Sequence, residues 1–171
     1  MLKNLWAPWR LEYVQHAGPK DPCFLCRAAV PGGEDDRLVL ERGRKTFAIL
    51  NRFPYSNGHL LVAPVRHVGD LGDLSSGERL ELLAMAEDFC GRLRKRLHAQ
   101  GLNLGLNLGA AAGAGLPGHL HLHVVPRWIG DTNFMPILAD TKVIAQSLEQ
   151  VRVLLSNRPR RIPAKRRPRR R

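Results

Sequence analysis

The feature that most constrains the fold is a run of three histidines at alternate positions, Gly118-His119-Leu120-His121-Leu122-His123-Val124-Val125-Pro126. Residues two apart share a face of a β-strand, so the alternation predicts a strand over 119–125 with the three imidazoles on one face. Leu120, Leu122 and Val124 would then pack into a core. Imidazoles beside an apolar layer are costly unless a ligand or metal uses them, so the run predicts a functional site.

Two kinds of chemistry fit this run. Zinc accepts imidazole readily, so a tri-histidine metal site is one option. The other is phosphate chemistry, because the preceding segment 107–118 is a loop of mostly tiny side chains. Backbone N–H groups in such a loop can approach an anion closely. A glycine-rich loop is weak support by itself, but this one leads directly into the histidines and favours phosphate.

The pattern from His119 to Val125 closely resembles the His-φ-His-φ-His-φ-φ signature (φ, hydrophobic) of the histidine-triad superfamily of nucleotide hydrolases and transferases. The resemblance covers roughly residues 4–155. Within it, a strand–turn–strand segment, a helix-entering loop and a strand end match the superfamily at 51–64, 65–74 and 105–109. Three further segments resemble its bacterial diadenosine tetraphosphate phosphorylase/hydrolase-like branch, at 4–10, 126–128 and 131–134.

This resemblance implies an enzyme that cleaves dinucleoside polyphosphates, diadenosine tetraphosphate first among them. It puts the nucleophile on His121, which would form a nucleotidyl–histidine intermediate that water or orthophosphate then releases. His123 would donate to a phosphate oxygen, and His119 is the first histidine of the triad. A nucleoside phosphoramidate or adenylylated-conjugate hydrolase is an alternative with the same histidine.

The resemblance also implies a nucleotide-binding set. Asn51 would contact the ribose hydroxyls, and Asn107 with the loop amides around Gly113 and Gly115 would surround the phosphates. The resemblance would place Phe47, Leu50 and Leu60 at the base, and Arg127 and Trp128 at the second half of a dinucleotide. Each of these side chains also has a purely structural interpretation. Phosphorylases of this branch tend to carry a hydroxyl residue near Gly115, which this chain lacks, so the acceptor stays open.

A Cys-x-x-Cys pair, Cys23 and Cys26, is the second motif. Taken alone it fits a redox pair, half a zinc site or two incidental thiols. Relatives in the superfamily complete such a pair with a histidine from a Pro-x-x-His loop and the first triad histidine, here His67 and His119. The resemblance therefore implies a structural Zn²⁺ and no organic cofactor, whereas Cys90 is expected only to pack in the core.

Charge is concentrated at one end of the 171-residue chain. The net charge is +12, and nine basic residues with no acidic one lie in 158–171, which leaves about +3 elsewhere. Prolines and self-repulsion predict a disordered tail, either merely solubilising or in non-specific contact with RNA, DNA or another polyanion. A nucleotide- or RNA-associated binding protein acting through this tail is therefore the alternative of another class.

Length and patterning predict one α+β domain, an antiparallel sheet with helices packed on it. We expect an arm over 1–22, a catalytic domain over 23–157 and the tail beyond. Predicted strands are 37–41, 46–50, 59–63, 102–108 and 119–125. A capping box at Ser75 and Glu78 starts a helix, and a second helix covers about 142–155. The residues expected on the buried face of the first helix are Leu82, Leu83, Ala86, Phe89, Cys90, Leu93 and Leu97.

The expected partners follow from the same features. A nucleotide is the expected substrate, and the resemblance implies a homodimer. The sequence has no run of about 18 apolar residues, so no membrane contact is expected. Three cysteines and an N-terminal segment without an apolar signal core predict a cytoplasmic protein.

Overall fold

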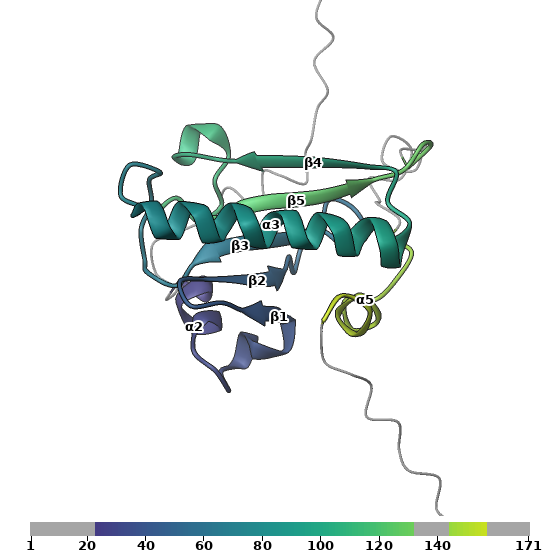
Figure 1. Ribbon diagram of the computed structural model, residues 1–171, viewed down its shortest axis with the longest axis horizontal. Coiled ribbons are helices and arrows are strands. Elements are labelled where there is room, and N and C mark those ends of the chain that lie inside the picture. The colour runs from purple at the N-terminus through teal and green to yellow at the C-terminus, as the bar shows by residue number, and fades with distance from the viewer. Residues whose placement is uncertain (1–22, 132–143, 157–171) are drawn as a thin grey trace, which may run out of the picture.

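A computed structural model describes residues 23–131 and 144–156. The predicted arm, the 132–134 part of the branch-specific segments and the basic tail lie outside these residues. The described part is an α+β domain built on a five-stranded antiparallel sheet in the order β1-β2-β3-β5-β4 (Figure 1). This confirms the predicted fold class.

The strands follow the apolar runs of the sequence, and β2 and β3 form the buried centre of the sheet. Every residue of both strands is buried, and the helix Ser76–Leu97 packs against both strands. The bounds are β1 Val39–Arg42, β2 Thr46–Leu50, β3 Leu60–Pro64, β4 Gly101–Leu106 and β5 Leu122–Arg127. Strand β4 lies at an edge and is largely exposed.

Helix α3, Ser76–Leu97, crosses one face of the sheet (Figure 1). It begins where predicted, because the Ser75 side chain accepts from the Glu78 N–H while the Glu78 carboxylate accepts from the Ser75 N–H. The predicted buried face is correct except for Leu83, which is 60% exposed, and Leu97, which is only partly buried. Met85 and Arg92 are buried instead. The burial of Arg92 was not expected because it depends on Glu41 and the Leu155 carbonyl, both distant in sequence.

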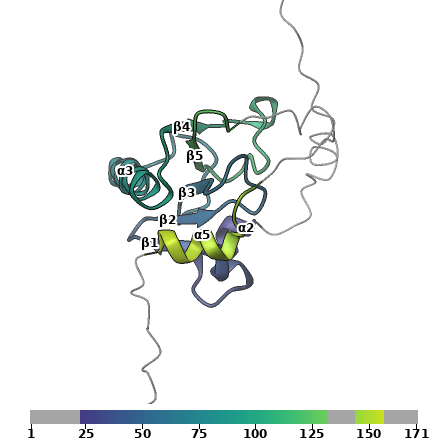
Figure 2. The ribbon, with the colours of Figure 1, turned by 90° about the vertical axis from the view of Figure 1, so that its right-hand side faces the viewer.

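Three short elements complete the domain. Helix α2, Phe24–Ala29, lies across the sheet from α3 (Figure 2), and a 3-10 helix, η1 Glu34–Leu38, follows it. Helix α5, Leu148–Leu155, packs against α3, β1 and η1. It is shorter than predicted, because a second capping box places its start after Ser147 rather than near residue 142.

Most predicted strand bounds were off by one to three residues. Arg37 and Leu38 belong to η1 rather than to a strand, and β4 ends at Leu106. A larger difference concerns the histidine run, whose strand begins only at Leu122. Among the described residues, no helix is both long and apolar enough to cross a membrane.

Candidate active site and metal centre

The three histidines of the run do not line one face of a single strand. His119 and His121 precede β5, and the Leu120 N–H donates to the Val68 carbonyl at 2.6 Å instead of pairing in the sheet. His119 and His121 are buried, like the leucines that alternate with them. The run therefore serves two separate clusters: His119 meets the cysteines, whereas His121 and His123 contact each other with ring centroids 5.0 Å apart.

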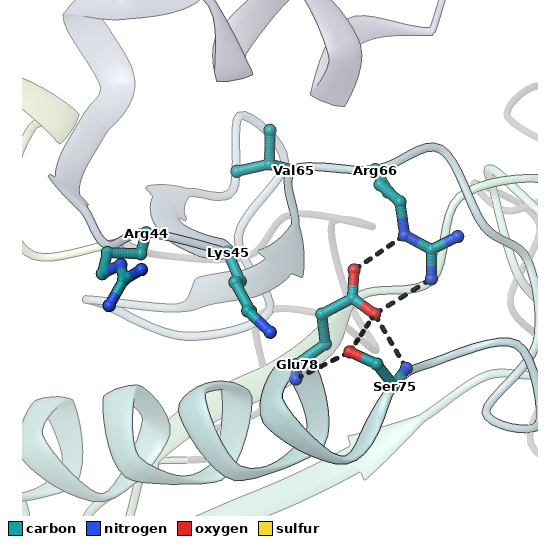
Figure 3. Close-up of a pocket in the computed structure, with 6 residues that line it drawn as sticks. All are labelled: Arg44, Lys45, Val65, Arg66, Ser75 and Glu78. Atoms are coloured by element: carbon teal, nitrogen blue, oxygen red, sulfur yellow. Dashed lines mark hydrogen bonds and ion pairs between the residues drawn. The ribbon is translucent and has the colours of Figure 1, made fainter.

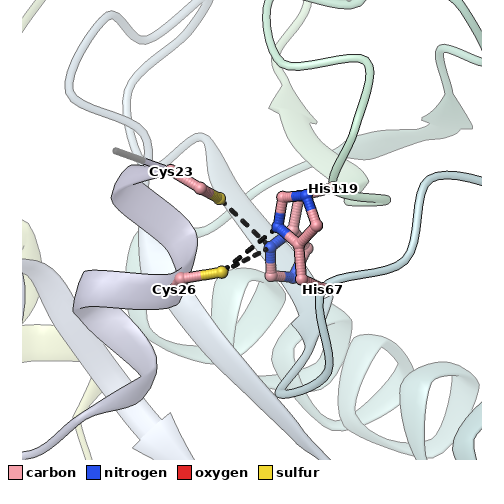
Figure 4. Close-up of side chains that lie close together, drawn as sticks. All are labelled: Cys23, Cys26, His67 and His119. Atoms are coloured by element: carbon pink, nitrogen blue, oxygen red, sulfur yellow. Dashed lines mark hydrogen bonds between the residues drawn. The ribbon is translucent and has the colours of Figure 1, made fainter. Parts of the chain in front are cut away.

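The first cluster contains the four residues that the resemblance implied for a metal, Cys23, Cys26, His67 and His119. One ligand atom from each lies within 4.8 Å of all the others. Figure 4 shows the two sulfurs, which come from the start of α2, directed at the two imidazoles. The Cys23 Sγ lies 3.2 Å from His119 Nδ1, and the Cys26 Sγ lies 3.2 Å from His67 Nδ1. Two thiols and two imidazoles are a donor set that suits tetrahedral zinc.

Hydrogen bonding prepares His119 for this role. Its Nε2 lies 2.9 Å from the Pro64 carbonyl, which can only accept, so Nε2 carries the proton and the Nδ1 lone pair faces the sulfurs. Burial lowers the pKa of His119, and the nearby His67 and His121 lower it further. Burial and the contact with Cys23 raise the pKa of the Cys26 thiol to about 11. A bound metal would replace that thiol proton, which couples metal binding to pH.

In the second cluster, the backbone fixes the tautomer of His121. Its Nδ1 lies 2.8 Å from the carbonyl of His119 and must donate, so Nε2 keeps its lone pair. Burial lowers the pKa of His121. A neutral imidazole with one nitrogen held and the other free is what nucleophilic attack requires.

His59 is a functional residue that sequence reasoning missed, because its place in the sequence indicates only the start of a strand. Its Nδ1 accepts the Tyr55 backbone N–H at 3.0 Å, so its Nε2 carries a proton. That Nε2 lies 3.0 Å from His123 Nδ1 and donates to it. Register explains the contact: Leu61 pairs with His123 across β3 and β5, and His59 lies two residues before Leu61 on the same face.

This bond also fixes the tautomer of His123. Because its Nδ1 accepts from His59, its Nε2 carries the proton, and this atom is buried with no hydrogen-bond partner among the described residues. Burial, with a smaller contribution from His121, lowers the pKa of His123 to about 4. His123 is thus a neutral donor at physiological pH. A buried N–H without a partner, next to the predicted nucleophile, can donate to a phosphate oxygen.

Asn51 lies in the turn 51–59, which carries Tyr55 and His59. Its Nδ2 lies 3.2 Å from His59 Nδ1, and its Oδ1 accepts the Phe53 N–H at 3.0 Å. Asn51 therefore helps to shape the turn next to the histidines. The glycine-rich loop 107–118 follows β4: Asn107 is half-buried, Ala110–Ala112 form one 3-10 turn, and Gly113 has a left-handed φ of 83°. Gly115 is half-buried in the same loop.

The other side chains of the expected nucleotide-binding set already have structural contacts. Phe47, Leu50 and Leu60 are at most 1% exposed and belong to the core. The Trp128 indole N–H donates to the His98 carbonyl at 2.9 Å. Arg127 pairs with both carboxylate oxygens of Asp131 at 2.6 and 2.8 Å. Outside this set, Cys90 is buried in the core, as expected.

A hollow of about 400 Å³ lies at the start of α3, and none of the residues that line it belongs to either cluster (Figure 3). Arg44, Lys45 and Arg66 line it, but Glu78 also faces it. Arg66 bonds both Glu78 oxygens at 2.8 and 2.9 Å and holds the pKa of that carboxyl far below its usual range. The ion pair satisfies the charges of Arg66 and Glu78, and we assign no ligand to this hollow.

The chain is similar in sequence and in fold to known proteins. The HIT domain family matches residues 33–128. A curated relative from Mycobacterium tuberculosis, AP-4-A phosphorylase, is 41% identical over 162 residues, which are 91% of this chain and 83% of that protein. A zinc-bound histidine triad family protein from Mycobacterium smegmatis is 27% identical, with a TM-score of 0.62 over 78% of this chain and 89% of its own.

A hypothetical histidine triad nucleotide-binding protein from Sulfolobus tokodaii shows a similar likeness. It is 25% identical, with a TM-score of 0.62 over 78% of this chain and 89% of its own. The match to more than half of the sequence and the 41% identity to the mycobacterial relative lead to one conclusion. The chain belongs to the HIT, or histidine triad, family.

Proposed function

We propose that this protein is a HIT-family enzyme that cleaves dinucleoside polyphosphates, diadenosine tetraphosphate in particular, through a nucleotide covalently attached to His121. The observation that carries the proposal is the 2.8 Å bond from His121 Nδ1–H to the His119 carbonyl, which leaves Nε2 free to attack. The 41% identity to AP-4-A phosphorylase supports the substrate.

The arrangement supports a two-step reaction. His121 Nε2 attacks the α-phosphorus of one nucleotide, a P–N bond forms, and the P–O bond to the departing ATP breaks with its electron pair on oxygen. His123 Nε2–H donates to a phosphate oxygen as charge develops there. Asn51 is assigned to the ribose, and Asn107 with the amides around Gly113 and Gly115 to the phosphates.

The second step decides the products. Water on the His121 adduct would release AMP, whereas orthophosphate would release ADP. The name of the Mycobacterium tuberculosis relative favours orthophosphate, although this chain has no serine or threonine at 109–115. We therefore propose phosphorolysis, with the loop's backbone N–H groups binding the incoming anion.

A chromatographic time course on diadenosine tetraphosphate, with and without orthophosphate, tests this proposal. ADP and ATP appearing only with phosphate is the expected result. AMP and ATP under both conditions would show hydrolysis and overturn the choice of acceptor. No turnover under either condition would contradict the substrate and direct attention to smaller nucleotide conjugates.

For the metal we propose Zn²⁺ on Cys23, Cys26, His67 and His119. The convergence of two thiols and two imidazoles supports it, as does the Pro64 carbonyl that orients His119. When bound, the ion would supply structural bracing, because four protein ligands leave no open position for a substrate. Metal analysis of the purified protein should find about one zinc per chain, and none would contradict the site.

We also propose that the protein acts as a homodimer. Two exposed features support this: the edge strand β4, with Leu104 48% exposed, and the outer face of α3, with Leu80 and Leu83 72% and 60% exposed. Unpaired strand edges and clustered apolar side chains are typical of surfaces that associate. Sedimentation should give twice the 19.2 kDa chain mass. A monomer at micromolar concentration would contradict the proposal.

Two further proposals concern the cell. The free thiols of Cys23, Cys26 and Cys90 support a reducing compartment, and we propose the cytoplasm. Nine basic residues in 158–171 support salt-sensitive, non-specific contact with nucleic acid. Deleting the tail should abolish RNA retention at low salt without changing turnover of the nucleotide. Unchanged retention would exclude the tail as the contact.

A further inference from the structure

A buried carboxylate outside both histidine clusters connects them. Asp35 lies on η1 and is only 3% exposed. Its Oδ2 accepts from Arg27 Nε at 3.2 Å, and its Oδ1 accepts from Arg52 Nη2 at 3.1 Å. A buried carboxylate requires such partners, because an unpaired one loses its hydration free energy and gains no interaction in return.

The two arginines come from segments that matter to different clusters. Arg27 directly follows Cys26, one of the proposed metal ligands, within α2. Arg52 directly follows Asn51 and belongs to the turn 51–59. The same turn presents the Tyr55 N–H that fixes the tautomer of His59. The Asp35 bridge therefore joins the start of α2 to the turn that orients His59, and through it His123.

We infer that Asp35 is a positioning residue that couples the metal cluster to the turn 51–59, so that a bound metal orders the turn around His59 as well as its own ligands. The inference rests on the proposed zinc site. A metal that fixes Cys26 also fixes Arg27, whose guanidinium holds Asp35 in place for Arg52. The metal cluster is thus connected to His121 through the His119 carbonyl. It is connected to His123 through Asp35, the turn 51–59 and His59.

A purely stabilising ion pair would behave differently from a coupling device. Loss of general stability speeds hydrogen exchange throughout the core, with or without metal. Loss of coupling affects only the turn, and only its response to the metal. The amides to follow are those of Asn51, Tyr55 and His59, which donate to the His59 carbonyl, His59 Nδ1 and the Ser56 carbonyl. Amides in the centre of α3 report general stability.

The experiment is hydrogen exchange on the full chain, zinc-loaded and after chelation, with zinc content measured in each sample. In the wild type, zinc should slow exchange of the turn amides by about 10-fold relative to the α3 amides. In Asp35→Asn the same ratio should fall below about 2-fold while zinc still binds. Arg52→Gln, which removes only the turn end of the bridge, should do the same if Asp35→Asn folds poorly.

Asp36→Asn is the matched control, because Asp36 lies on the same η1 helix but pairs with Arg42 at 2.8 Å. It should keep the full response of the turn to zinc. Turn amides that respond to zinc equally in the wild type, Asp35→Asn and Arg52→Gln would overturn the inference. So would a zinc-loaded wild type whose turn does not respond. If metal analysis finds no zinc in the wild type, the proposed site itself fails, which the exchange data alone would not show.

Discussion

The two clusters that share the histidine run use the same side chain for different purposes. In the metal cluster, His119 donates from Nε2 to the Pro64 carbonyl and directs Nδ1 at two sulfurs. Two residues later, His121 donates from Nδ1 to the His119 carbonyl and keeps Nε2 free. Opposite tautomers follow from which nitrogen meets a backbone acceptor. The local hydrogen bond, not the residue type, therefore separates the proposed metal ligand from the proposed nucleophile.

The clusters also differ in what completes them. Side chains alone complete the metal cluster, because four of them converge within 4.8 Å. The second cluster, which contains His121 and His123, instead leaves the buried Nε2 of His123 without a hydrogen-bond partner among the residues described. A cluster that supplies all four ligands from the protein suits a structural role. A buried N–H without a partner instead suits a group that donates to a substrate oxygen on which negative charge develops. Substitutions at four of these residues test this division.

The largest effect is expected for the nucleophile. His121→Asn should lower kcat by at least about 10⁴-fold, since the covalent step is lost. Zinc content should stay unchanged, because the metal uses His119 and not His121. Steady-state kinetics and metal analysis measure both. His98→Asn, at an exposed position with φ 54°, is the control and should retain full activity. Substantial turnover by His121→Asn would contradict the assignment.

A substitution in the metal cluster should lower metal content and stability, whereas the change at His121 should lower only the rate. Cys26→Ser should remove the zinc and lower the free energy of unfolding by about 4 kcal/mol or more, as expected for loss of a structural metal. Denaturant unfolding with parallel metal analysis measures this loss. Cys90→Ala changes a thiol that only packs in the core and should keep the zinc. If Cys26→Ser retains a full equivalent of zinc, the two clusters are not divided as described.

The depressed pKa of His123 predicts a pH dependence of stability. Unfolding restores its ordinary value of 6.5, so the unfolded state binds the proton more tightly than the folded state, whose pKa is about 4. Stability should be unaffected above pH 6.5 and should fall as the pH drops from 6.5 to 4. The loss attributable to His123 is on the order of 3 kcal/mol.

Unfolding curves of the wild type and His123→Gln between pH 7 and pH 4 isolate this effect. Acid-driven release of zinc is common to both proteins, so only the difference between the curves reports His123. The difference should shrink as the pH falls. Two parallel curves would show that burial does not hold His123 neutral.

The smallest effect is expected for His59, which donates to His123 Nδ1. His59→Leu removes the donor to His123 Nδ1 and should lower kcat by about 10- to 100-fold, as loss of an orienting partner does. KM should change little, because the proposed mechanism gives His59 no role in binding the substrate. His59→Gln places an amide N–H near the lost Nε2 and should recover part of the rate. Equal rates for the two variants would mean that the donor is not what matters.

Much of the fold was accessible from sequence because it depends on local patterns. The capping box at Ser75 and Glu78 placed the start of α3, and the apolar run at 46–50 is strand β2 without adjustment. The prediction that Leu83 is buried was wrong. Helical spacing alone does not show which of two adjacent apolar residues, Leu82 or Leu83, faces the sheet. The capping box at Ser147 was available in the sequence and would have corrected the start of α5.

The sequence by itself determined the residue types at the site and the resemblance to the family, and that resemblance implied the candidate metal set. Only the tertiary structure divided the histidine run, added His59 to His123 and joined Cys26 to the turn through Asp35. These relations depend on strand register and on hydrogen bonds to groups far away in the chain. A linear pattern states which side chains are present, whereas their tautomers and partners are set by what the fold brings within about 3 Å.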